Sequence, residues 1–233
     1  MDTREWRQKL RFAVPQLMTA CRLVVGATAL ILALEGNRLF LIATLLTLGI
    51  VIGGLSDQIA RWLHATTPFG TLFDGVTEYL TVVIAPWALT RALLISPRTT
   101  LQEVLLDLPL MTGAIRYARN GQLLTDVRAV RGLDAGFFAF VSVTTVFLRL
   151  PELLSSAQLT AFLIPVIALL SVLMIVPLRY PRLTVVPSLS LATLVLLAVM
   201  PFVETQLLTT AAVVLGLLYG ILGHMFAGVP TEK

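Results

Sequence analysis

Long, uninterrupted apolar stretches are the feature that most constrains this chain. A helix needs about 20 mainly apolar residues to cross the hydrocarbon core of a bilayer. Eight such stretches follow one another, at about residues 14–34, 38–63, 70–95, 100–119, 133–150, 157–178, 186–202 and 206–227. The strands of a membrane barrel would instead alternate apolar and polar residues over about 10 positions. The sequence therefore predicts an all-α, polytopic transmembrane helical bundle of about eight spans.

The composition excludes the soluble alternatives. Charged residues make up 13 % of the 233 residues and hydrophobic residues 57 %, whereas a typical soluble domain is about 25 % charged. The single cysteine, Cys21, rules out a disulfide scaffold. A net charge of +4 would suggest nucleic acid in a soluble protein. Here the basic residues gather at the predicted membrane edges, so we expect no nucleic-acid partner.

The distribution of Lys and Arg predicts the orientation of the chain. An even number of spans places both termini on one side, and twelve basic residues fall on that side. The opposite side holds four, namely Arg38, Arg91, Arg98 and Arg149. Basic residues favour the cytoplasmic side, so we predict cytoplasmic termini in a multi-pass protein of the cytoplasmic membrane. The fourth stretch contains Glu103, Asp107 and Pro109, and losing it would change this count.

Three parts of the chain differ in pattern. Residues 1–12 place Arg4, Arg7, Lys9 and Arg11 beside apolar side chains, which is typical of a basic amphipathic helix lying on a lipid surface. Residues 13–182 form the main predicted transmembrane domain, and residues 183–233 add a C-terminal pair of transmembrane helices. Membrane lipids are therefore expected partners.

Three acidic residues lie near the ends of the second and third spans. Asp57 falls at the end of the second, and Asp74 and Glu78 lie one turn apart at the start of the third. The short connection makes these helices neighbours, so the carboxylates can converge. Such a cluster repels itself without a cation, and all-oxygen ligation suits Mg²⁺, Mn²⁺ or Ca²⁺. The alternative is that the acids pair with Arg61 or Arg116, or stay solvated at the interface.

Three arginines are candidates for anion contacts. Arg116 and Arg119 share one helix face at the predicted cytoplasmic edge, and guanidinium groups fork onto carboxylates and phosphates. They are predicted to hold a lipid phosphate or the carboxylate of an acceptor, or else to anchor the helix at the headgroups. Arg22 lies inside the first predicted span, where we expect it to snorkel or to pair with one of the acids.

The second and third spans carry a recognisable spacing. Residues 53–61 read GGLSDQIAR, eight residues follow, and residues 70–78 read GTLFDGVTE. This segment resembles the signature of the CDP-alcohol phosphatidyltransferase family, D-x2-D-G-x2-A-R-x8-G-x3-D-x3-D. Ala60, Arg61, Gly70 and Asp74 fall on signature positions, and Glu78 stands at the last aspartate.

Further segments are similar to the phosphatidylserine synthase branch of that family. Residues 15–22, PQLMTACR, resemble P-N-x-x-T-x-x-R, and residues 114–120, AIRYARN, resemble A-L-R-L-A-R-F-N. Leu173–Met174 with Arg179–Pro181 resemble L-M-V-S-x-x-R-Y-P. The resemblance covers about residues 12–182 and implies the helical fold of that family.

The resemblance also implies a reaction. Family members transfer a phosphatidyl group from CDP-diacylglycerol to a small alcohol, with serine the expected acceptor here, and release CMP with Mg²⁺ or Mn²⁺ bound. They are homodimers. Carried over, the metal ligands are Asp57, Asp74 and Glu78, with Glu78 also the catalytic base. The expected nucleotide-binding residues are Ser56, Ala60, Arg61 and Gly70.

This chain departs from the signature at the acids of the second span. The first acid of the family falls on Gly53, the second on Ser56, and the following glycine on Asp57. Two interpretations remain open: a transferase that works around one metal ion, or a catalytically inactive member that binds lipid or a partner protein. Inverted repeats are not apparent and the acids cluster at one edge rather than the midplane, which argues against a transporter.

Overall fold

The computed structural model describes residues 3–36, 38–95, 97–121, 129–148, 150–176 and 179–181. In this part the fold is all-α apart from two three-residue strands. The helices are α1 (Thr3–Glu35), α2 (Leu39–Trp62), α3 (Pro68–Tyr79), the π-helix η1 (Leu80–Ile84), α4 (Ala85–Leu93), α5 (Thr100–Gly121), α6 (Gly136–Phe147), α7 (Leu150–Leu153) and α8 (Ser156–Ile175). The first six predicted spans each coincide with helical structure, and the last two lie outside the described residues.

Four of these helical segments are long and apolar enough to cross a membrane. They are Arg11–Glu35, Leu39–Trp62, Pro68–Leu93 and Ser156–Ile175. The first belongs to α1, which runs without a break from Thr3, so the segment predicted to lie on the lipid surface continues directly into the span. The chain is accordingly a membrane-embedded helical protein.

Two of the other predicted spans have distinct properties. Helix α6 is apolar but only 12 residues long. The helix ends before Leu148, and Pro151 lies in the short helix α7 that follows. Helix α5 has 22 residues but contains Glu103 and Pro109. Its N-terminus carries a reciprocal cap, in which Gln102 N donates to Thr99 Oγ1 at 3.3 Å and Thr99 N donates to Gln102 Oε1 at 2.9 Å.

A π-helical turn interrupts the third span. Pro86 has no backbone N–H and so cannot donate to the carbonyl four residues earlier. Just before it, the amide of Ala85 donates to Leu80 O, five residues back, which is the π-helical pattern. Gly26 of α1 packs against this turn, since a Cβ at Gly26 would collide with Thr81 Cγ2. Because Gly26 has no side chain, α1 can pack close to η1.

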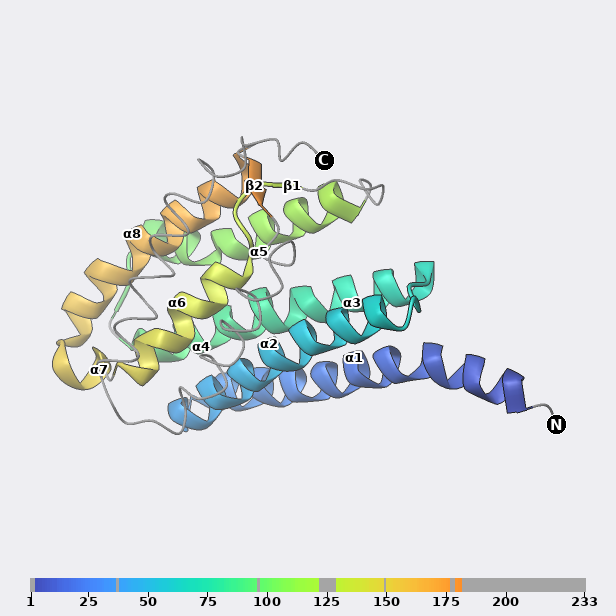
Figure 1. Ribbon diagram of the computed structural model, residues 1–233. Coiled ribbons are helices and arrows are strands. Elements are labelled where there is room, and N and C mark those ends of the chain that lie inside the picture. Colours follow the sequence, from blue (N-terminus) through green and yellow to red (C-terminus); the bar gives the residue numbers. More distant parts are fainter. Residues whose placement is uncertain are drawn as a thin grey trace.

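The bundle has two closely packed helix pairs. Helices α1 and α2 lie side by side, as do α5 and α8 (Figure 1). One apolar core joins residues of α1, α2, α4 and α6, among them Ala29, Ile42, Leu89 and Val143. A second joins η1, α5, α6 and α8, among them Val83, Leu106, Phe138 and Leu163. Helix α3, which carries Asp74 and Glu78, lies toward one end of the bundle (Figure 1).

A small antiparallel sheet ties the loop after α5 to the segment after α8. Strand β1 (Ala129–Arg131) pairs with β2 (Arg179–Pro181), with Val130 opposite Tyr180. Gly132 follows β1 in the left-handed region, at φ +85°, and the amide of Leu133 then donates to Leu173 O at 3.0 Å. An all-α chain was predicted from the sequence, so this pairing was not expected.

Candidate functional site

The substituted signature positions of α2 face α1. Ser56 is buried, and its hydroxyl donates to Pro15 O at 3.1 Å and lies 3.4 Å from Thr19 Oγ1. Thr19 Oγ1 also donates to Pro15 O at 3.1 Å. Pro15 O therefore accepts a hydroxyl from its own helix, Thr19, and a second one from α2, Ser56. In this position Ser56 joins two helices.

Gly53, one turn before Ser56, is covered by an arginine from α1. A Cβ at Gly53 would stand 2.5 Å from Cζ and Nη1 of Arg22 and 2.8 Å from its Nε. The side chain of Arg22 is only 6 % exposed, and its Nη1 lies 3.5 Å from Oδ1 of Asp74 on α3. The expectation that Arg22 pairs with one of the acids is confirmed.

Glu78 lies one turn beyond Asp74 and is half-buried. Electrostatic interactions reach it from Arg22, Asp134, Arg116 and Asp74. The structure thus brings together the two predicted acids of α3, and Glu78 interacts electrostatically with a guanidinium from α1 and one from α5. Asp57, the third predicted ligand, is exposed on α2 next to the buried Ser56.

The residues do not form a recognisable metal centre. Within the described ranges, no three side chains of His, Cys, Asp or Glu gather in a group that could hold a metal ion. The carboxylate of Asp74 has Arg22 as its electrostatic neighbour, and that of Glu78 has Arg22 and Arg116. The described side chains therefore do not fit a divalent ion in the arrangement that the signature requires.

Arg116 is held inside the protein. It is 5 % exposed, its Nη2 donates to Oδ2 of Asp134 at 3.2 Å, and its guanidinium lies 5.4 Å from the ring centre of Tyr117. Asp134 in turn accepts from Gly136 N at 2.7 Å and so orients the start of α6. Arg116, predicted to meet a lipid phosphate or an acceptor, pairs here with the internal carboxylate of Asp134.

Arg119 caps a helix. Its Nη1 donates to Ile175 O at 2.9 Å and its Nη2 to Met174 O at 3.3 Å. The last carbonyls of a helix have no intrahelical donor and carry partial negative charge. Arg119 therefore stabilises the C-terminus of α8, a role the sequence could not reveal because the two segments are far apart along the chain.

The remaining predicted nucleotide-binding residues lie around the end of α2 and the start of α3. Arg61 is exposed and Ala60 is half-buried, and the carbonyl of Ala60 accepts from Ala65 N at 2.9 Å as α2 ends. Gly70 N donates to Thr67 Oγ1 at 3.0 Å, which caps α3. Gly70 lies one turn before Asp74 on α3, and contact of these residues with a nucleotide stays a prediction.

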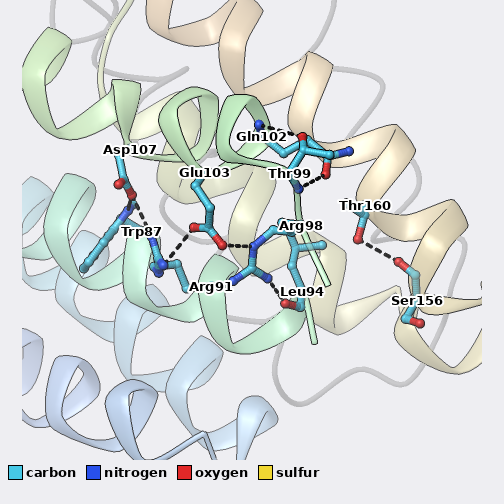
Figure 2. A network of polar contacts seen from close by, with 10 residues as sticks. All are labelled: Trp87, Arg91, Leu94, Arg98, Thr99, Gln102, Glu103, Asp107, Ser156 and Thr160. Carbon is cyan, nitrogen blue, oxygen red and sulfur yellow. Dashed lines mark hydrogen bonds and ion pairs between the residues drawn. The ribbon is translucent and has the colours of Figure 1, made fainter. Parts of the chain in front are cut away.

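A second charged cluster joins α4 to α5, outside the signature (Figure 2). Arg91 Nη1 lies 2.8 Å from Asp107 Oδ1 and its Nη2 lies 2.9 Å from Glu103 Oε2. Trp87 Nε1 also donates to Asp107 Oδ1 at 2.8 Å, and Arg98 Nε donates to Glu103 Oε1 at 2.7 Å. Two arginines thus neutralise the two acids that made the fourth span doubtful from sequence.

Comparison with known proteins adds no relative to this picture. No protein-family model matches the chain, and no curated protein matches it.

Proposed function

We propose that this chain is a catalytically inactive protein on the scaffold of the CDP-alcohol phosphatidyltransferases, and that it acts by binding membrane lipid or a partner protein. The observation that carries the proposal is the burial of positions 53 and 56. Gly53 lies under the guanidinium of Arg22, and Ser56 is hydrogen-bonded to α1. Both positions hold metal-ligating acids in the family that the sequence resembles, and here both contribute to helix packing.

The proposed architecture has eight spans and cytoplasmic termini in the cytoplasmic membrane. Support comes from the four apolar helices and from the twelve-to-four distribution of basic residues. The ion pairs of Arg91 with Glu103 and Asp107 also favour insertion of α5, since an unpaired charge at the bilayer centre costs about 2.5–3.5 kcal/mol. By analogy with the family, we expect a homodimer.

A second candidate is a transferase that moves a phosphatidyl group from CDP-diacylglycerol to serine. The observation in its favour is that Asp74 and Glu78 keep their signature spacing and interact electrostatically. Asp57, Asp74 and Glu78 would bind Mg²⁺ or Mn²⁺, Glu78 would take the proton of the acceptor hydroxyl, and the metal would supply charge stabilisation at the diphosphate. The second candidate requires Arg22 to leave its place against Gly53.

An assay of CMP release separates the two candidates. We expect membranes containing the full chain to release no CMP from CDP-diacylglycerol, with Mn²⁺ present and with serine, glycerol or inositol as acceptor. The physical reason is that the two signature acids of α2 are replaced by Gly53 and Ser56, so metal ligands are missing. Glu78 also stands where the signature has aspartate, and correct positioning of an acid–base group contributes about 10²–10⁴-fold to the rate.

The controls are two variants of the same chain. Asp74→Asn removes the central carboxylate, and Glu152→Gln changes an exposed acid on α7. CMP release that Asp74→Asn abolishes and Glu152→Gln leaves unchanged would establish the transferase and overturn the inactive assignment.

A further inference from the structure

A buried arginine in a membrane helical bundle requires a partner that compensates its charge. Arg22 is 5 % exposed, and its Nε has no hydrogen-bond partner among the described residues. A buried charge is costly unless it is paired. Asp74 is the ion-pair partner of Arg22, with Oδ1 3.5 Å from Nη1. The position of Arg22 is therefore tied to the acids of α3.

The lack of a side chain at residue 53 makes this position available to Arg22. The guanidinium lies against the backbone of Gly53, within 2.5 Å of where a Cβ would be. Any larger residue, aspartate included, would have to displace the guanidinium. An aspartate at position 53 would therefore require the end of the Arg22 side chain to shift from its present place.

The acids on α3 have their positive charge supplied from within the chain. Glu78 interacts with Arg22 and Arg116, and with the carboxylates of Asp74 and Asp134. Arg22 supplies the positive charge that faces Asp74, while Arg116 is paired with Asp134. A carboxylate cluster requires a cation, and this chain provides it without a metal.

We propose that the guanidinium of Arg22 is the resident cation of this site, that it stands in place of a divalent metal ion, and that Gly53 makes room for it. The inference rests on the proposed function for its comparison with the metal-dependent scaffold. The family segment that residues 15–22 resemble also carries an arginine, so the difference that we assign here is Gly53, which lets the guanidinium of Arg22 occupy the site. Removing Arg22 and placing an acid at position 53 should therefore open a site for Mg²⁺ or Mn²⁺.

The test is Mn²⁺ binding by the purified full chain in detergent micelles, followed by electron paramagnetic resonance and by the thermal midpoint. The wild-type chain should bind no stoichiometric Mn²⁺, and its midpoint should be the same in Mn²⁺ and in EDTA. The double variant Arg22→Ala, Gly53→Asp should bind one Mn²⁺ at least about tenfold more tightly than wild type. Its midpoint should rise with Mn²⁺ because a ligand that binds only the folded state stabilises it.

Two further variants locate the ion. Adding Asp74→Asn to the double variant should abolish the gain, and Glu152→Gln, which changes an exposed acid on α7, should leave wild-type behaviour. Stoichiometric Mn²⁺ binding by the wild-type chain that Asp74→Asn removes would overturn the inference. So would a folded double variant that binds no more tightly than wild type.

The outcome is independent of the activity assay. Wild-type binding of Mn²⁺ without CMP release contradicts the role of Arg22 and leaves the inactive assignment in place. CMP release contradicts the inactive assignment itself. If the double variant does not fold, the wild-type titration alone still decides whether the acids of α3 already hold a metal.

Discussion

Replacing Gly132 with alanine should lower the free energy of unfolding by about 3 kcal/mol or more. Gly132 has φ +85°, and a Cβ there would collide with the carbonyl oxygen of Met174 and stand 2.9 Å from Nη2 of Arg119. Both the backbone strain and the collision act at the junction of β1 with α8. The carbonyl belongs to the backbone, so the collision cannot be relieved by a rotamer change.

The measurement is denaturant-induced unfolding of the purified chain in micelles, with Gly75→Ala as the matched control. Gly75 lies within α3, and a Cβ there meets nothing within 4 Å. Alanine is the better helix former by about 0.5–1 kcal/mol, so the control should be neutral or slightly stabilised. Equal stability of the two variants would show that the turn at Gly132 is not as described.

Substitution of Asp74 by alanine should cost about 3 kcal/mol of stability, because it removes the ion-pair partner of the buried Arg22. Arg22→Met in the same background should recover part of that loss, since the unpaired charge is then gone. The double-mutant cycle should consequently show a coupling energy of about 1 kcal/mol or more between the two residues.

The same unfolding experiment provides the control for this cycle. Glu152→Gln changes an exposed acid and should alter stability by less than about 0.5 kcal/mol. Strictly additive effects of Asp74→Ala and Arg22→Met would mean that the two side chains do not interact, and the account of the site would fail.

Much of the helical layout could be predicted because apolar length is a property of the sequence alone. The ranges 14–34 and 38–63 correspond to α1 and α2, and the turn between them has Gly36 at φ 71°. The length of α6 was overestimated. Apolar residues continue past Phe147, but the helix ends there, and apolar character alone does not show where hydrogen bonding stops.

The candidate site was predicted in part. Asp74 and Glu78 share a helix face by spacing alone, and pairing of Arg22 with an acid followed from the high cost of an isolated charge in a span. The contact of Arg22 with Gly53 could not be predicted, because it depends on the rotation of α1 relative to α2. The ion pair of Arg91 with Asp107 was also missed, although a helical hairpin of α4 and α5 makes it reasonable.

Arg119 illustrates a limit of another kind. Its type and its place at the membrane edge favour an anionic ligand, and guanidinium groups bind carbonyl oxygens as well as phosphates. The structure places it at the C-terminal carbonyls of α8. Which acceptor an arginine meets is decided by tertiary contacts between distant segments, and those leave no signal in the local sequence.

The most direct test of the central claim is an experimental structure of the full chain determined with CDP and Mn²⁺, using the anomalous scattering of manganese to locate the ion. The account predicts no manganese peak between α2 and α3, with the guanidinium of Arg22 against Gly53 and beside Asp74. A manganese peak ligated by Asp57, Asp74 and Glu78, with Arg22 displaced from Gly53, would contradict it.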